Sequence, residues 1–266
     1  MIRGCRFFVF TQAYSSTNTY FSPSFKSIFM TIKFLPLAIA LLFCQSFAFG
    51  IGIYNPGDEL FVQAGSGLLM RKTPDPKGER VQTLNHGDAV KVLKADFKKK
   101  PHSVEEFKGF IIKGFWVKVS TANGKEGYVF DGYLSKNRAP ITIIDDSNSG
   151  NSVAELYLMS NSGKKGERVN LPKSETRYER YKQLFKNGSE AEMDFGEGGS
   201  SQKITFQKGI TMEEAYLIGK VLWLKDLKVK SSFVKGKITV TSEDELTQIE
   251  VSNHFGVAVL LMSHAD

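Results

Sequence analysis

Residues 114–136 read GFWVKVSTANGKEGYVFDGYLSK and contain the clearest structural signal in the chain. Val117 and Val119 alternate with larger or polar side chains, which is the period-two pattern of a half-buried strand. An Asn-Gly pair at 123–124 separates this run from a second strand-like run at 127–130. Because Asn and Gly both tolerate a positive φ, the pair favours a tight hairpin turn. The stretch therefore predicts two antiparallel strands joined by that turn.

Further short runs of strand-forming residues precede this hairpin. They cover Glu59–Ala64, Gly67–Arg71 and Ala89–Lys94. The segment at 73–78, TPDPKG, consists of turn-forming residues and predicts a loop. About five short strands with tight turns in one continuous stretch predict a small β-barrel, so the chain is expected to be mainly β.

Residues 57–136 resemble the bacterial SH3-like (Src-homology-3-like) domain of exported cell-envelope proteins, since both the residue types and their order agree. The matching residues are Val62, Ala64, Gly67, Leu68, Met70, Arg71, Pro74, Val81, Leu84, Gly87, Val90, Val92, Leu93, Trp116, Lys118, Val119, Gly124, Gly127, Val129, Tyr133 and Leu134. The family commonly has Asn or Asp at the position of Leu69 and Trp at the position of Tyr128. Residues 95–114 lengthen a connection that is usually short in this family.

The resemblance implies recognition of peptidoglycan peptides or envelope proteins rather than catalysis. Trp116, Tyr128 and Tyr133 are candidate ligand-binding residues, because aromatic rings line the grooves in which SH3 folds bind extended peptides. The alternative for these rings is a place in the barrel core. Arg71 is a fourth candidate, either pairing with a ligand carboxylate or forming a structural salt bridge.

The long connection at 95–114 reads ADFKKKPHSVEEFKGFIIKG and combines basic with aromatic residues. As a loop it is a candidate contact for an anionic envelope polymer. The residues expected to contact that polymer are Lys98, Lys99, Lys100 and His102. The alternative is a solvated loop that binds nothing.

Residues 30–50 read MTIKFLPLAIALLFCQSFAFG and have the three-part layout of a secretory signal peptide. The apolar run is too short for a membrane span, which needs about 20 residues. Cleavage after Ala48 and cleavage after Gly50 both fit the small-residue pattern. We expect residues 30–49 to be the signal peptide and residues 1–29 to be an over-extended start before the true initiator, Met30. The protein is then exported, to the periplasm or an extracellular location, with no membrane span after cleavage.

The formal charge of +7 is concentrated in this leader. Residues 1–49 hold four basic residues and no acidic one, whereas the rest of the chain holds 31 basic and 28 acidic residues, a net charge of +3. A charge this small argues against a nucleic acid as partner. Both cysteines also precede residue 50, so the mature chain has no thiol for catalysis.

Residues 137–152 are rich in small polar side chains and predict a linker to a second domain at 153–266. Thr211 and Glu214 form a capping box, and apolar residues follow at helical spacing, so one helix begins here. Strands are expected at Val153–Ser160, Thr176–Lys186, Glu190–Phe195, Lys203–Gln207, Lys237–Thr241, Leu246–Val251 and Gly256–Met262, with Phe233 in a further one. The last run is apolar throughout, which indicates a central strand. The expected fold is an α+β domain, an antiparallel sheet with one helix, of no recognised family.

A three-residue loop at Asn187–Ser189 is expected to join two of these strands. This register places Lys182 opposite Asp194 and brings opposite charges together across the strands. It also makes Glu190, Glu192 and Asp194 one outward acidic row. Acid–base catalysis needs a carboxyl group kept protonated by burial or by a like charge, so a row beside lysines predicts a solvated face.

The remaining sequence contains no pattern for catalysis, metal binding or a cofactor, and none is expected. The four histidines are too scattered for a zinc site, and no nucleophile motif is present. The leading hypothesis is an exported, non-enzymatic protein that binds a cell-wall peptide or an envelope protein. The alternative is a cell-wall hydrolase or another envelope enzyme with a divergent C-terminal catalytic domain.

Overall fold

The computed structural model describes residues 54–98, 100–140, 151–162 and 164–266. The expected signal peptide, the segment before it and residues 141–150 of the expected linker lie outside the described residues. Ala48–Asp266 forms one compact unit, which contains both sheets. In the described part of the chain, no helix is long and apolar enough to cross a membrane.

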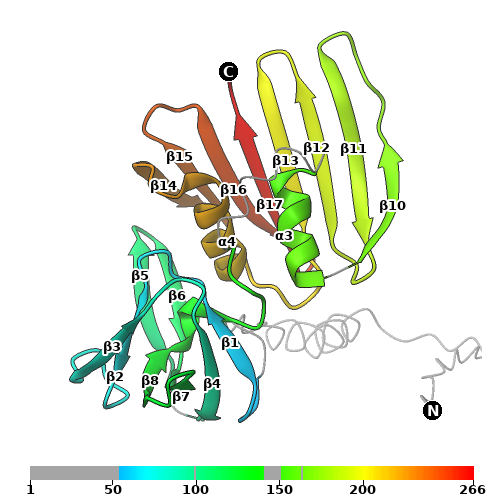
Figure 1. The fold of residues 1–266 in the computed structure, drawn as a ribbon. Helices are drawn as coiled ribbons and strands as arrows, with labels where there is room; N and C mark the ends of the chain where they lie inside the picture. The colour runs from blue at the N-terminus through cyan, green and yellow to red at the C-terminus, as the bar shows by residue number, and fades with distance from the viewer. Residues whose placement is uncertain (1–53, 99, 141–150, 163) are drawn as a thin grey trace, which may run out of the picture. The chain divides into compact units, whose positions relative to one another are not determined.

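The N-terminal sheet has seven antiparallel strands in the order β3-β2-β8-β7-β4-β1-β9 (Figure 1). They are β1 (Glu59–Val62), β2 (Leu68–Arg71), β3 (Arg80–Leu84), β4 (Ala89–Lys94), β7 (Trp116–Thr121), β8 (Glu126–Phe130) and β9 (Leu134–Ser135). The hairpin predicted at 114–136 is present as β7 and β8, with Val117 opposite Val129. The end strands β3 and β9 are not neighbours in this order, so the sheet of the described residues is not a closed barrel.

Side chains along β7 alternate between the core of this sheet and its opposite, partly exposed face. Val117 and Val119 are buried, whereas Trp116 and Lys118 on the opposite side of the strand stay partly exposed. The two valines pack with residues from every long strand of this sheet, among them Leu60, Val62, Met70, Val90, Val92 and Val129. The period-two pattern of the sequence therefore decides that Trp116 lies outside this core.

The connection predicted as a loop at 95–114 is mostly a β-hairpin, here called the inserted hairpin. Its strands, β5 (His102–Phe107) and β6 (Phe110–Gly114), form a separate two-stranded sheet. Phe110 and Ile112 on β6 are buried and alternate with exposed Ile111 and Lys113. The insertion thus has one apolar face, and only the residues before β5 remain a loop.

The C-terminal sheet has eight antiparallel strands in the order β10-β11-β12-β13-β17-β16-β15-β14. They are β10 (Lys165–Asn170), β11 (Arg177–Phe185), β12 (Glu190–Gly196), β13 (Gly199–Thr205), β14 (Val229–Val234), β15 (Lys237–Ser242), β16 (Thr247–His254) and β17 (Val257–His264). Helix α3 (Val153–Ser162) contacts β11 to β13, and helix α4 (Met212–Leu224) contacts β15 to β17 (Figure 1). The apolar strand β17 is central, as predicted.

Helix α4 begins at Thr211, whose Oγ1 accepts a hydrogen bond of 3.1 Å from the backbone N–H of Glu214, as the predicted capping box requires. The Glu214 carboxylate instead accepts hydrogen bonds from the Ser135 hydroxyl and from Asn137 Nδ2, so only the Thr211 half of the predicted box is present. Gly219 faces the sheet, and a Cβ at this position would lie 2.6 Å from Leu260 Cδ1. The helix can therefore approach the strands closely only because this residue has no side chain.

The prediction of a strand at Val153–Ser160 is wrong, because this segment is helix α3. Ser152 and Glu155 form a second capping box: the Glu155 N–H donates to Ser152 Oγ at 3.2 Å, and the Ser152 N–H donates to Glu155 Oε2 at 2.9 Å. Ala154, Tyr157 and Leu158 are buried at helical spacing. The C-terminal domain consequently has two helices in its described residues rather than one.

The predicted loop is displaced by one residue along the chain, which shifts the cross-strand pairing by two residues. The loop is Lys186–Gly188, since the Phe185 N–H donates to the Ser189 carbonyl, and Lys182 lies opposite Glu192 rather than Asp194. The predicted outward acidic row is nevertheless present and fully paired. Its ion pairs are Lys182–Glu190 at 2.9 Å, Lys203–Glu192 at 2.5 Å and Arg180–Asp194 at 2.7 Å.

The inserted hairpin joins the two sheets through aromatic packing. The Phe110 ring centroid lies 5.3 Å from that of Tyr216 on α4 and 5.6 Å from that of Phe233 on β14. Phe110, Ile112 and the β8 residue Phe130 belong to the same buried cluster as the inner face of the C-terminal sheet. Residues of the insertion therefore complete the larger of the two cores.

Asp131, which follows β8, fixes the start of the described chain and the start of β7. This buried carboxylate accepts hydrogen bonds from the Tyr54 hydroxyl and, at 2.6 Å, from the Phe115 N–H. Burial raises the pKa of Asp131 to about 6, although both hydrogen bonds act in the opposite direction. The folded protein therefore retains a proton that the unfolded chain releases near pH 4.

Replacing Asp131 with Asn is expected to change how stability depends on pH. Between about pH 4 and pH 6 the native state of the parent binds more protons than the unfolded chain, so its stability falls by about 2–3 kcal/mol as pH rises. An Asn side chain has no titrating proton, and the variant should lack this fall. Urea unfolding of both proteins from pH 4 to pH 7 gives the free energy of unfolding at each pH. If this free energy changes with pH in the same way for both proteins, the raised pKa of Asp131 is contradicted.

Candidate functional site

Two of the predicted ligand-binding residues share one small cavity on the N-terminal sheet. Trp116 from β7 and Tyr128 from β8 line a cavity of about 200 Å³, here called the aromatic cavity. The other lining residues are Pro74, Lys94, Asp96, Lys100 and Phe115. The cavity thus combines aromatic surface with two ammonium groups and one carboxylate.

Packing behind the cavity holds the Trp116 ring in place. Its centroid lies 5.9 Å from that of His102 and 6.4 Å from that of Phe130. The ring remains only half-buried, as does Tyr128. Trp116 therefore packs against its neighbours on one side and lines the cavity on the other. Its position combines features of the two predicted alternatives, a core residue and a groove residue.

Arg71 shapes the wall of the aromatic cavity and does not line it. Its Nη1 donates a hydrogen bond of 2.7 Å to the Gly78 carbonyl, across the loop that contains Pro74. Arg71 also lies opposite Tyr128 in the pairing of β2 with β8. In the structure the Arg71 guanidinium thus contacts a backbone carbonyl of its own domain, and its role as a ligand-binding residue stays a prediction.

The basic segment predicted to bind an anionic polymer lies beside this cavity. Lys100 lines it, and Lys98 is exposed. The neighbouring Phe97 makes edge contacts with Tyr54 and Phe115, at 5.0 and 5.4 Å between ring centroids, which fixes the loop. His102 belongs to β5 and packs against Trp116, and Lys99 lies outside the described residues. The sequence analysis predicted an aromatic groove and a basic loop as two separate sites. In the structure, Lys100 lines the same cavity as Trp116 and Tyr128.

Tyr133 lies at a different place and contributes nothing to the aromatic cavity. It ends a 3-10 turn, η2 (Asp131–Tyr133), and its hydroxyl donates a hydrogen bond of 2.8 Å to Glu106 of the inserted hairpin. The Tyr216 hydroxyl and the Lys220 ammonium also donate to Glu106, at 3.2 and 3.1 Å. Burial and the Glu106 charge raise the pKa of both tyrosines, so both hydroxyls remain donors.

A larger cavity of about 460 Å³, here called the junction cavity, opens beside Glu106. It is lined by residues of the β1–β2 loop, by Glu106 and Tyr133, and by α4 and the residues that follow it. Sequence reasoning missed this cavity. Glu106 was expected in a loop, and no motif connects it to Lys220. Only the alternation within the inserted hairpin was visible in the sequence.

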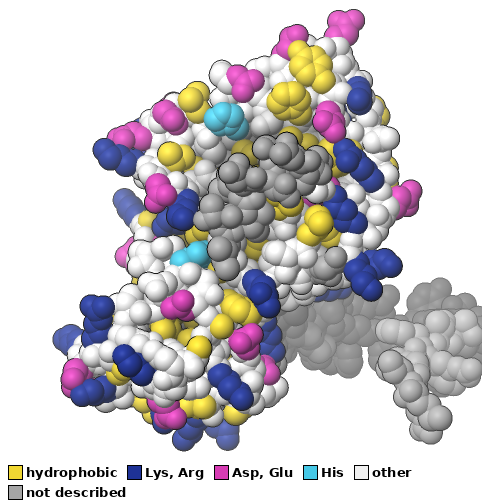
Figure 2. All heavy atoms as spheres, viewed as in Figure 1, with side chains coloured by type: hydrophobic (Ala, Val, Ile, Leu, Met, Phe, Trp, Pro, Cys, Tyr) yellow, Lys and Arg dark blue, Asp and Glu magenta, His cyan; other side chains and the backbone are white. Residues whose placement is uncertain are grey.

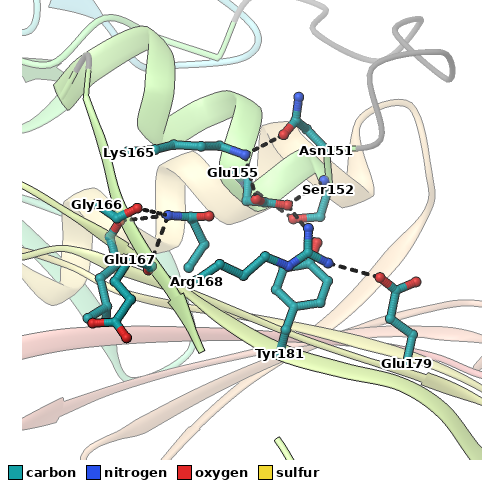
Figure 3. Close-up of polar contacts among 11 residues, drawn as sticks. Asn151, Ser152, Glu155, Lys165, Gly166, Glu167, Arg168, Glu179 and Tyr181 are labelled. Carbon is teal, nitrogen blue, oxygen red and sulfur yellow. Dashed lines mark hydrogen bonds and ion pairs between the residues drawn. The ribbon is translucent and has the colours of Figure 1, made fainter. Parts of the chain in front are cut away.

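A buried polar cluster beneath α3 has a structural role (Figure 3). The Glu155 carboxylate is fully buried and accepts hydrogen bonds from Lys165 at 2.8 Å and from the Tyr181 hydroxyl at 2.6 Å, in addition to that from Ser152. Burial raises the pKa of Glu155, but these three donors together bring it below its ordinary value. The Arg168 guanidinium lies 3.4 Å from the centroid of the Tyr181 ring. An ionised carboxylate with this many donors anchors α3 to β10 and β11.

Replacing Glu155 with Gln is expected to destabilise the protein by about 2–3 kcal/mol at pH 7, because it leaves Lys165 without its buried partner. The lowered pKa means that the carboxylate stabilises the fold above the unfolded pKa and that this contribution is lost as pH falls through the folded pKa. The deficit of the variant, measured by urea unfolding, should therefore shrink below about pH 4. Glu179→Gln is the matched control, because its pair with Arg168 is exposed, and it should cost less than about 0.5 kcal/mol. Equal losses for the two variants would contradict the anchoring role.

No group of three or more metal-ligating side chains occurs among the described residues. On the face drawn in Figure 2, Lys and Arg side chains are interspersed with Asp and Glu and form no patch of a single sign. On this face the two signs of charge are therefore mixed.

Comparison with known proteins identifies one part of the chain. No curated protein and no solved structure matches it. Residues 66–135, from the β1–β2 loop to β9, match the family model of the bacterial SH3 domain. The match includes the inserted hairpin and omits β1, although β1 pairs with β4 and β9 in the same sheet. The resemblance found in the sequence is confirmed: residues 66–135 are a bacterial SH3 domain.

Proposed function

We propose that the chain is an exported, non-enzymatic protein whose bacterial SH3 domain binds a peptide of the cell envelope in the aromatic cavity. The observation that carries the proposal is the convergence of Trp116, Tyr128 and Lys100 on one cavity. A single ligand in this cavity would contact both the aromatic pair and the basic loop, which the sequence presents as separate features.

The dimensions and chemistry of the cavity favour a peptide. A volume of about 200 Å³ suits one or two side chains of a longer ligand rather than a whole cofactor. The Trp116 and Tyr128 rings offer flat apolar surface at little conformational cost. Lys94 and Lys100 can pair with peptide carboxylates. We therefore favour an extended peptide with at least one acidic group.

A cell-wall peptide is the ligand that we test first, and an envelope protein is the other. Export rests on residues 30–49 and is part of the proposal. The ion pairs of the acidic row and of Glu155 give these carboxylates structural partners. The non-enzymatic assignment is itself part of the proposal.

Tyr128→Ala and Lys100→Ala are each expected to reduce binding of the mature protein to purified peptidoglycan about tenfold, because each removes a side chain that lines the cavity. Co-sedimentation measures the bound fraction, and titration with soluble stem peptides gives the affinity. Tyr133→Phe is the matched control: it also removes a polar group from a tyrosine of the same domain, but outside the cavity, and should leave binding unchanged. Parental binding by both cavity variants would contradict the proposed site.

The same samples test the enzymatic alternative. Chromatography of the supernatant should reveal no soluble wall fragments after incubation with the parent protein. Fragments released by the parent and by Tyr128→Ala alike would overturn the non-enzymatic assignment. If peptidoglycan and stem peptides bind neither parent nor variants, the cell-wall ligand is excluded and an envelope protein remains.

A further inference from the structure

The junction cavity is separate from the aromatic cavity, and the inference drawn from it does not rest on the function proposed above. Of the 15 residues that line the junction cavity, none lines the aromatic cavity. Its walls come from the N-terminal sheet, the inserted hairpin and α4. The site therefore exists only because the insertion brings Glu106 to the helix.

The interior of the junction cavity is rich in hydrogen-bond acceptors. The Glu106 side chain is only 16% exposed and carries a negative charge beneath the tyrosine hydroxyls. Gln63, 1% exposed, uses its Nε2 to donate to the Asn137 carbonyl at 2.8 Å, while its Oε1 has no hydrogen-bond donor among the described residues. A buried acceptor without a donor is costly, so a donor supplied by a ligand would be favourable here.

The end of α4 adds to this preference. Leu224 and the residues just after the helix line the cavity, so the negative end of the helix dipole lies at its edge. Asp226, which has a positive φ of 65°, follows at once and brings a further carboxylate to the wall. Both features favour a cation.

The basic residues of the cavity lie towards solvent. The Lys220 side chain is 42% exposed and pairs with Glu106, and Lys225 is exposed. An ion pair this exposed contributes little to stability, so its ammonium group can be displaced from Glu106 at low cost. The apolar part of the wall includes the buried residues Leu68, Leu217, Val221 and Leu224 and the exposed Leu227.

We propose that the junction cavity binds a primary ammonium group on an aliphatic stem, which takes the place of the Lys220 ammonium on Glu106. The stem lies along the apolar wall of α4, and the ammonium group donates to Glu106. A lysine side chain of a partner and a small free alkylamine share this chemistry.

Binding of two probes to the mature protein tests the proposal. The probes are n-pentylammonium and Nα-acetyl-lysine N-methylamide, each titrated into ¹⁵N-labelled protein and followed by NMR. Both should shift the amide signals of Leu217 and Val221. Glu106→Gln should weaken binding at least about tenfold, since a charged hydrogen bond is lost. Lys220→Met should strengthen it about two- to fivefold, because the internal competitor is removed while its apolar stem is kept.

Lys225→Met is the matched control. It removes the same charge from the same rim but no partner of Glu106, so it should change the dissociation constant by less than about twofold. Trp116→Ala should bind the amines like the parent, which separates this proposal from that for the aromatic cavity. If Glu106→Gln proves unfolded by its thermal melt, the comparison of Lys220→Met with Lys225→Met decides alone.

Several results would overturn the proposal. These are equal effects of Lys220→Met and Lys225→Met, parental affinity in a folded Glu106→Gln, binding of uncharged n-pentanol as tight as that of the amine, or no binding of either probe. Binding of both probes assigns the site to lysine side chains of partners. Binding of n-pentylammonium alone assigns it to small free amines.

Discussion

The packing of Phe110 against Tyr216 and Phe233 is the contact on which the rest of the arrangement depends. It buries the apolar face of the inserted hairpin. Without a partner, an exposed face containing Phe110 and Ile112 would be an unfavourable addition to a soluble domain. Docked, it extends the core of the C-terminal sheet and carries Glu106 to the junction cavity.

The same insertion serves both candidate sites. Its first residues hold Lys100 beside Trp116 and Tyr128, and its first strand places His102 behind the Trp116 ring. Glu106, near the end of β5, is held by two tyrosine hydroxyls and Lys220. A change in how the hairpin docks would therefore alter the surroundings of both cavities, which gives the two sites a physical connection even though they share no lining residue.

Local patterns in the sequence predicted local structure well. The alternation around Val117, the Asn-Gly turn and the Thr211 capping box each specify their element through nearest neighbours, and each element is present. The wrong prediction of a strand at Val153–Ser160 could also have been avoided from local sequence, because Ser152 and Glu155 have the spacing of a capping box. Non-local relations could not be read in this way. The two-residue shift in the β11–β12 pairing keeps the same residues on each face, so the alternation of apolar residues could not distinguish the two registers. The contact of Glu106 with Lys220 joins segments with no sequence relation.

The most direct test of this account is equilibrium unfolding with one fluorescent probe in each sheet's domain. The chain has two tryptophans, Trp116 in the SH3 domain and Trp223 on α4, so Trp223→Phe and Trp116→Phe each leave one reporter. If Phe110 couples the two parts, the two reporters unfold at one urea midpoint, and adding Phe110→Ala separates the midpoints because it removes about 3–5 kcal/mol of shared packing. Separate midpoints before that substitution, or one common midpoint after it, would contradict the account.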